Sequence, residues 1–76
     1  MEHNHTALSD LFAQLGLSAD QEAITEFVQK NAGLPAEIKI ENAPIWTKQQ
    51  AAFLRSALAE DAEWAEVIDQ LNALLR

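Results

Sequence analysis

The stretch that decides the fold covers residues 45–75 and reads IWTKQQAAFLRSALAEDAEWAEVIDQLNALL. Its large apolar residues recur every three or four positions, which is the spacing of one face of an α-helix. Both tryptophans of the chain, Trp46 and Trp64, fall within this stretch. We therefore expect it to provide the apolar surface on which the first half of the chain packs.

The boundaries inside this stretch follow from helix-capping residues. Thr47 and Gln50 have the spacing of a capping box, in which each side chain bonds the backbone N–H of the other residue. The acidic pair Glu60-Asp61 interrupts the apolar pattern, and Asp61 is a favourable N-cap. We predict two helices, over residues 48–59 and 62–75. A single helix over the whole range is the alternative, because no glycine or proline separates the two.

Two shorter helices are expected before this stretch. The first covers residues 7–15, with Thr6 as its N-cap and a left-handed Gly16 as its C-terminal cap. The second covers residues 19–31, with Ser18 and Gln21 forming a capping box. Residues 1–6 are polar, and we expect them to be flexible.

In the segment between the second and third helices, every second residue is apolar over a short run. Ile38 and Ile40 alternate there with charged residues, as in an extended strand. A lone strand is not independently stable. We therefore predict an extended connector whose isoleucines rest on the helices. The alternative is a strand edge that pairs with another chain.

The predicted fold class is all-α: a small four-helix domain with an extended connector between the second and third helices, made by residues 1–76 as a single domain. Hydrophobic residues make up 49% of the 76 residues, which favours a packed core over disorder. The chain has no cysteine, so disulfides and zinc-thiolate sites are excluded.

The net charge of −7 limits the classes of partner. Acidic residues are in excess in both halves of the chain, and no basic patch is present to neutralise phosphates. We therefore expect no nucleic-acid binding and no binding to anionic membranes. The chain has no apolar run of membrane-spanning length and no signal peptide, so a cytoplasmic location is expected.

The N-terminus carries a candidate metal site. A free amine, two deprotonated amide nitrogens and an imidazole at position three form a square-planar nitrogen site, which copper(II) and nickel(II) prefer. Met1 and His3 provide this arrangement, with His5 close enough to assist. The alternative is that both histidines are ordinary residues of a solvated tail.

Other catalytic patterns are missing from the sequence. No serine has a histidine and a third orienting group at recognisable positions, and the isolated glycines do not form a phosphate-binding loop. The carboxylates from Glu60 to Asp69 lack the histidines of a helical di-metal site and are expected to form a solvated helix face. We expect a protein that is not an enzyme and uses no cofactor.

The predicted role is a protein-interaction or regulatory module whose partner is a protein surface, with a basic surface as one option, or a second copy in a homodimer. Tryptophan, arginine and neighbouring apolar residues often anchor interfaces. The candidate partner-binding residues are Ile38, Ile40, Trp46, Phe53, Arg55 and Trp64. For each tryptophan, the alternative is an anchor in the core. A second hypothesis is a small-ligand cleft near the connector, bounded by Ile38, Ile40, Trp46 and Phe53.

Several segments carry a resemblance to a known family. They are the run from His5 to Leu17, which contains Leu-Ser-Asp-Leu-Phe and Gln-Leu-Gly-Leu, the segment Ala-Pro-Ile-Trp-Thr at residues 43–47, and the run from Gln50 through Trp64 to the C-terminus. The chain thereby resembles a group of small bacterial proteins defined as domain-of-unknown-function family 2789. The resemblance covers nearly the whole chain. It implies a stand-alone small bacterial protein, and it implies no activity, cofactor or site residue.

Overall fold

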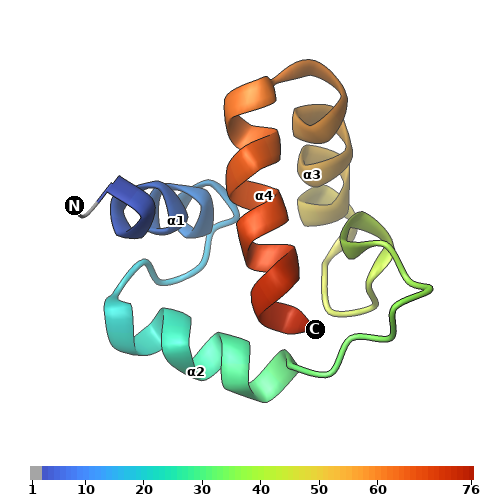
Figure 1. Ribbon diagram of the computed structural model, residues 1–76. Coiled ribbons are helices and arrows are strands. Elements are labelled where there is room, and N and C mark those ends of the chain that lie inside the picture. The colour runs from blue at the N-terminus through green and yellow to red at the C-terminus, as the bar shows by residue number, and fades with distance from the viewer. Residues whose placement is uncertain (1–2) are drawn as a thin grey trace.

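Helix α4 (Ala62–Leu75) lies at the centre of the fold, and the other three helices surround it (Figure 1). The structure is a computed structural model that describes the backbone of residues 3–76 and the side chains of residues 8–76. Helices α1 (His3–Gln14), α2 (Gln21–Asn31) and α3 (Lys48–Glu60) each contact α4. Because the described residues form helices and contain no strand, the predicted all-α class with four helices is confirmed.

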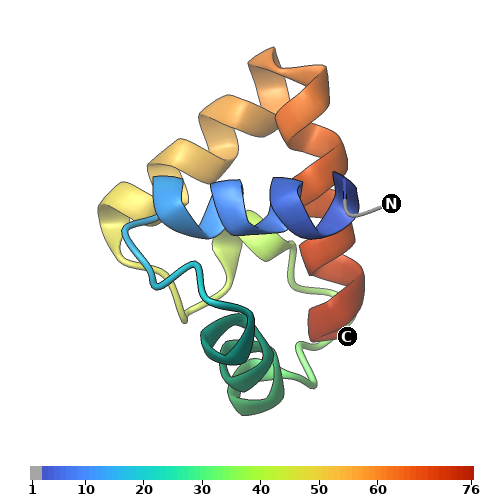
Figure 2. The same cartoon turned by 90° about the vertical axis from the view of Figure 1, so that its left-hand side faces the viewer.

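The core is built on one face of α4. Ile68, Leu71 and Leu75 are fully buried, and their spacing of three and four residues places them on one side of the helix. Helix α1 runs across this face, and its C-terminal end lies beside the start of α3 (Figure 2). The other fully buried large side chains come from these two helices and are Leu11, Phe12 and Leu54. Residues 45–75 therefore provide the packing surface, as their periodicity predicts.

Helix α1 ends as expected but begins earlier. Gly16 has a φ of 75°, and the N–H of Leu17 donates to the Phe12 carbonyl at 2.9 Å, while the Gly16 N–H donates to the Ala13 carbonyl at 3.0 Å. These bonds form a Schellman motif, in which a left-handed glycine closes the helix. The predicted start is wrong, because the helix begins at His3 and Thr6 lies inside it. The first turn holds only polar residues, so no apolar pattern marked its beginning.

Helix α2 begins two residues later than predicted. Its N-cap is Asp20, not Ser18, so the proposed capping box of Ser18 with Gln21 is wrong. Asp and Ser are about equally favourable N-caps, and the sequence offers both within three residues. Asp20 has an extended backbone and caps the helix without a side-chain hydrogen bond.

The segment between α2 and α3 differs most from expectation. The predicted connector is present and Ile40 packs in the core as expected, but the segment is a series of turns that includes a 3-10 helix, η1 (Ile40–Asn42), and is not extended. Two of its turns are closed by hydrogen bonds within the segment, from the Ile38 N–H to the Pro35 carbonyl at 3.1 Å and from the Asn42 N–H to the Lys39 carbonyl at 2.9 Å. These bonds leave no strand edge, so the alternative of pairing with another chain through such an edge is also wrong.

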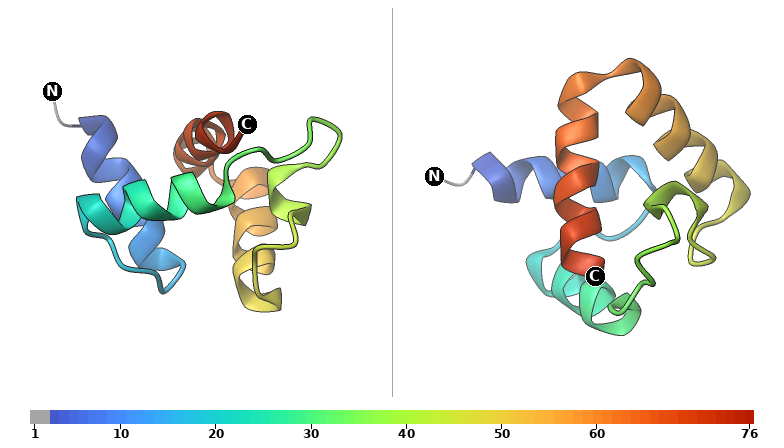
Figure 3. Two further views of the ribbon diagram at one scale, coloured as in Figure 1. Left: turned by 90° about the horizontal axis from the view of Figure 1, so that it is seen from below. Right: turned by 45° about the vertical axis from the view of Figure 1, so that its right-hand side comes forward.

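The C-terminal end of α4 holds the beginning of this segment. The Leu75 carbonyl accepts hydrogen bonds from the N–H groups of Gly33 at 2.9 Å and Leu34 at 2.8 Å. The Arg76 guanidinium donates to the Pro35 carbonyl at 2.5 Å. Figure 3 shows this end of α4 beside α2 and the connecting segment. A helix end whose carbonyls have no intrahelical partner thereby fixes a loop.

The boundary between α3 and α4 confirms the two-helix prediction. The Asp61 carboxylate accepts hydrogen bonds from the N–H groups of Glu63 at 3.0 Å and Trp64 at 3.2 Å. The predicted capping box is present at the start of α3, where Thr47 and Gln50 bond each other's backbone N–H. The single-helix alternative is therefore excluded.

The described chain is compact. Its Cα radius of gyration is 11.5 Å, and about 11 Å is expected for a folded chain of this length. Of the helices in residues 3–76, none combines the length and the apolar character that a membrane span requires.

Candidate functional site

The five aromatic side chains fall into two groups. Phe12, Phe27 and Trp46 form one group, in which Phe12 meets Phe27 edge to face at 5.3 Å and Phe27 stacks on Trp46 at 5.7 Å between ring centroids. Phe53 and Trp64 form the other, meeting edge to face at 5.8 Å. The first group joins α1, α2 and Trp46, the residue before the Thr47 cap. These three rings therefore stabilise the fold.

Trp46 is held within the fold by a polar contact as well. Its indole Nε1 donates a hydrogen bond of 2.7 Å to the carbonyl of Ile40. The Ile40 side chain is itself only 5% exposed. The bond therefore joins η1 to the start of α3, and the two residues anchor the connecting segment.

The Phe53–Trp64 pair lies between hollows at the molecular surface. Both side chains are half-buried. Phe53 lines a hollow of about 290 Å³ with Gln14 and Gln50, and the two aromatic residues together line one of about 250 Å³. Trp64 continues into a third hollow, of about 380 Å³, between α1 and α4. Shared residues thus connect the three hollows into one band centred on the aromatic pair.

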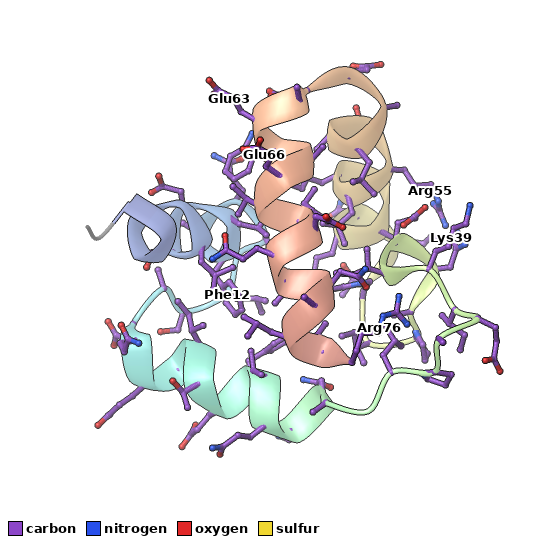
Figure 4. All side chains as sticks on the ribbon, viewed as in Figure 1. Phe12, Lys39, Arg55, Glu63, Glu66 and Arg76 are labelled. Atoms are coloured by element: carbon purple, nitrogen blue, oxygen red, sulfur yellow. The ribbon has the colours of Figure 1, made fainter. Side chains whose placement is uncertain are left out.

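Carboxylates line two of the three hollows in this band. Every described ionisable side chain that lines the three hollows is acidic. We call the aromatic pair and these carboxylates the acidic-aromatic face, and its residues are Asp10, Phe53, Glu60, Asp61, Glu63, Trp64 and Glu66. Glu63 and Glu66 stand near the N-terminal end of α4 (Figure 4). The face can therefore offer cations both carboxylates and aromatic rings.

Local structure explains how so many acids are held together. The end of α3 and the beginning of α4 meet at Asp61, so Glu60 and Glu63 lie on either side of one corner. The N-terminus of α4 carries the positive end of the helix dipole, which favours acids in the first turn. Asp61 bonds two N–H groups of that turn, whereas Glu63 and Glu66 are exposed and point their charge to solvent.

Basic side chains gather elsewhere. Figure 4 shows Lys39, Arg55 and Arg76 beside the connecting segment and the C-terminal end of α4. Arg55 donates a hydrogen bond of 3.2 Å to the Asn42 side chain. It lines a hollow of about 350 Å³ with Trp46 and Lys48. Glu41 lines the same hollow, so this region carries both signs of charge, whereas the ionisable residues of the acidic-aromatic face are all acidic.

The predicted partner-binding residues divide between these places. Phe53 and Trp64 meet on the acidic-aromatic face, Trp46 and Arg55 line the hollow beside η1, and Ile40 lies in the core. Ile38 is half-buried in the connecting segment. The predicted ligand cleft of Ile38, Ile40, Trp46 and Phe53 does not correspond to any of these hollows. Trp46 and Phe53 line different ones. The aromatic residues alone did not indicate which tryptophan lies beside the carboxylates.

The contribution of Asp10 was missed by the sequence analysis. It comes from α1, more than fifty positions before the acids of α4, and lines the same hollow as Glu63 and Glu66. Only the crossing of α1 over α4 brings these residues together, and no local sequence pattern contains that information. A second feature that was missed is an uncharged groove of about 420 Å³ among α1, α2 and α4.

The predicted metal site lies outside the described residues. Met1 is not described, and only the helical backbone is described for His3 and His5. Copper or nickel binding there stays a prediction. Within the described part of the chain, no group of three or more His, Cys, Asp or Glu side chains is placed to hold a metal ion.

Fold and surface together define a small, acidic, all-α protein of four helices with an acidic-aromatic face. The chain belongs to the family described as "Protein of unknown function (DUF2789)", whose model matches residues 1–75. This match confirms the family resemblance found in the sequence. No curated protein and no solved structure matches the chain.

Proposed function

We propose that this protein is a non-enzymatic interaction module that binds a basic segment of a partner protein on its acidic-aromatic face. The observation that carries the proposal is the position of the Phe53–Trp64 pair in a band of hollows whose described ionisable residues are all carboxylates. The net charge of −7 adds a long-range attraction for basic partners and speeds their encounter.

The chemistry of the face favours arginine in the partner. An arginine guanidinium stacks on tryptophan and makes two parallel hydrogen bonds with a carboxylate. Trp64 and Glu63 line the same hollow, so one guanidinium has both kinds of group within the site. Lysine offers a point charge without this planar fork, so we expect arginine peptides to bind more tightly than lysine peptides of equal charge.

The test is a calorimetric titration of the protein with a short peptide in which arginines alternate with leucines. We expect binding that weakens as salt is raised, because exposed charges are screened over about 8 Å at physiological ionic strength and about 3 Å at 1 M. The Glu63→Lys/Glu66→Lys double variant should bind at least about tenfold more weakly, since two attractive contacts become repulsive.

A matched control separates the face from net charge alone. Glu22→Lys/Glu26→Lys changes the net charge by the same amount on exposed positions of α2. We expect this variant to keep most of the affinity. Equal loss in both double variants, or no heat of binding with the arginine peptide, contradicts the proposal.

A further inference from the structure

A second surface, on the side of the molecule formed by α1, α2 and α4, has the opposite chemistry. The apolar side chains that line its groove are Leu8, Ile24, Val28 and Leu74. Leu74 is 46% exposed and is the most exposed large apolar side chain in the described part of the chain. A contact that covers Leu74 and the apolar lining beside it would remove apolar area from water, which favours association.

The rim of this groove is polar but uncharged. Thr25, Gln29 and Gln70 line it, and every described lining side chain is neutral. The molecule as a whole has a net charge of −7. Two copies of a strongly acidic protein repel each other, and a contact through neutral side chains avoids placing carboxylates opposite one another.

From this we infer that the groove binds a second copy of the same chain. A two-fold interface uses one patch on both copies, so the patch must be complementary to itself. The groove meets this requirement because Leu74 supplies a projection beside a hollow, and a glutamine amide both donates and accepts hydrogen bonds. A rim of carboxylates alone would repel its own copy across the two-fold axis.

The expected dimer is weak. Eight described residues line the groove, whereas stable interfaces use about 20 to 30 residues on each side. We therefore expect association that depends on concentration and becomes stronger as salt is raised, because salt screens the repulsion between the two copies. This response to salt is opposite to that expected for the basic peptide, so the two proposals can fail separately.

Sedimentation equilibrium of the full chain, from about 10 µM to about 1 mM, tests the inference over the range of weak affinities. The average mass should rise from 8.4 kDa toward twice that value. Leu74→Glu should weaken association at least about tenfold, because it places a carboxylate in the neutral patch. The matched control is Ala73→Glu, which adds the same charge at a neighbouring exposed position outside the groove lining.

Two further measurements test the groove independently of the Leu74 variant. Gln29→Glu, at an exposed rim position, should weaken association even if the Leu74 variant folds poorly. In the unmodified protein, concentration-dependent amide shifts should cluster at Val28 and Leu74. A mass of 8.4 kDa at every concentration and salt level overturns the inference. Equal effects of the Ala73 and Leu74 variants, or shifts centred on Phe53 and Trp64, also overturn it.

Discussion

At the scale of single residues, Gln50 joins two helices through one side chain. Its Oε1 accepts the Thr47 N–H at 2.9 Å, which completes the cap of α3. Its Nε2 donates to the Leu15 carbonyl at 2.9 Å, at the C-terminal end of α1. The two ends of one amide group thus fix where α1 stops relative to where α3 begins, beside the aromatic hollow that Phe53 lines.

Gln50→Glu separates these two contacts. The carboxylate still accepts the Thr47 N–H, but it cannot donate to Leu15 and places a negative charge beside that carbonyl. We expect a loss of about 1–2 kcal/mol in the free energy of unfolding, measured by urea denaturation. Gln49→Glu is the matched control and should change stability by less than about 0.5 kcal/mol, because Gln49 is exposed. Equal losses in the two variants would show that the Leu15 contact contributes nothing.

Contacts of single residues were predictable from the sequence only where both partners lie close together in the chain. Local pairs such as Thr47 with Gln50 were predictable, because both partners lie within one helical turn. The bond from Gln50 to Leu15 spans 35 positions and has no sequence pattern. Likewise, both tryptophans fitted either the core or a partner surface, and only tertiary packing placed Trp46 on Phe27 and Trp64 beside Phe53.

At the scale of elements, the corner between α3 and α4 organises the acidic-aromatic face. Asp61 ends one helix and starts the next, and Trp64 lies in the first turn that it caps. The orientation of the indole against Phe53 therefore depends on where α4 begins. This boundary was predictable, because a capping aspartate interrupts an apolar pattern there.

Removing this cap should cost stability. Asp61→Ala is expected to lower the free energy of unfolding by about 1 kcal/mol, since two N–H groups of α4 lose their acceptor. Asp61→Asn should retain most of the stability, because asparagine caps about as well as aspartate. Denaturant unfolding of both variants measures the difference. An Asn variant as unstable as the Ala variant would indicate that the charge, and not the cap, matters.

The connecting segment shows why other elements were not predictable. A period of two over five residues matches a strand, but here it arises because Ile40 turns into the core within η1 while its neighbours stay outside. The segment is held by bonds at two ranges. Trp46 donates to the Ile40 carbonyl within the segment, whereas Gly33 donates to the Leu75 carbonyl at the other end of the sequence. The second kind of contact exists only after α4 has packed beside this segment.

At the scale of the whole molecule, α4 both supports the core and carries part of the acidic-aromatic face. Its buried face holds α1, α2 and α3, while Glu63 and Glu66 stand near its N-terminal end. A basic partner therefore meets a surface there whose described ionisable groups are all carboxylates. The neutral groove between α1, α2 and α4 leaves a separate place for contact between copies.

The two indole N–H signals in a nitrogen-labelled NMR spectrum test the central proposal most directly, because they report on two different environments in one titration. The Trp46 indole is bonded to Ile40 inside the fold, whereas Trp64 lies on the acidic-aromatic face. On addition of the arginine-leucine peptide, we predict that the Trp64 signal shifts and the Trp46 signal stays in place. A shift of Trp46 with an unchanged Trp64, or no shift of either, would contradict the proposal that this face binds basic segments.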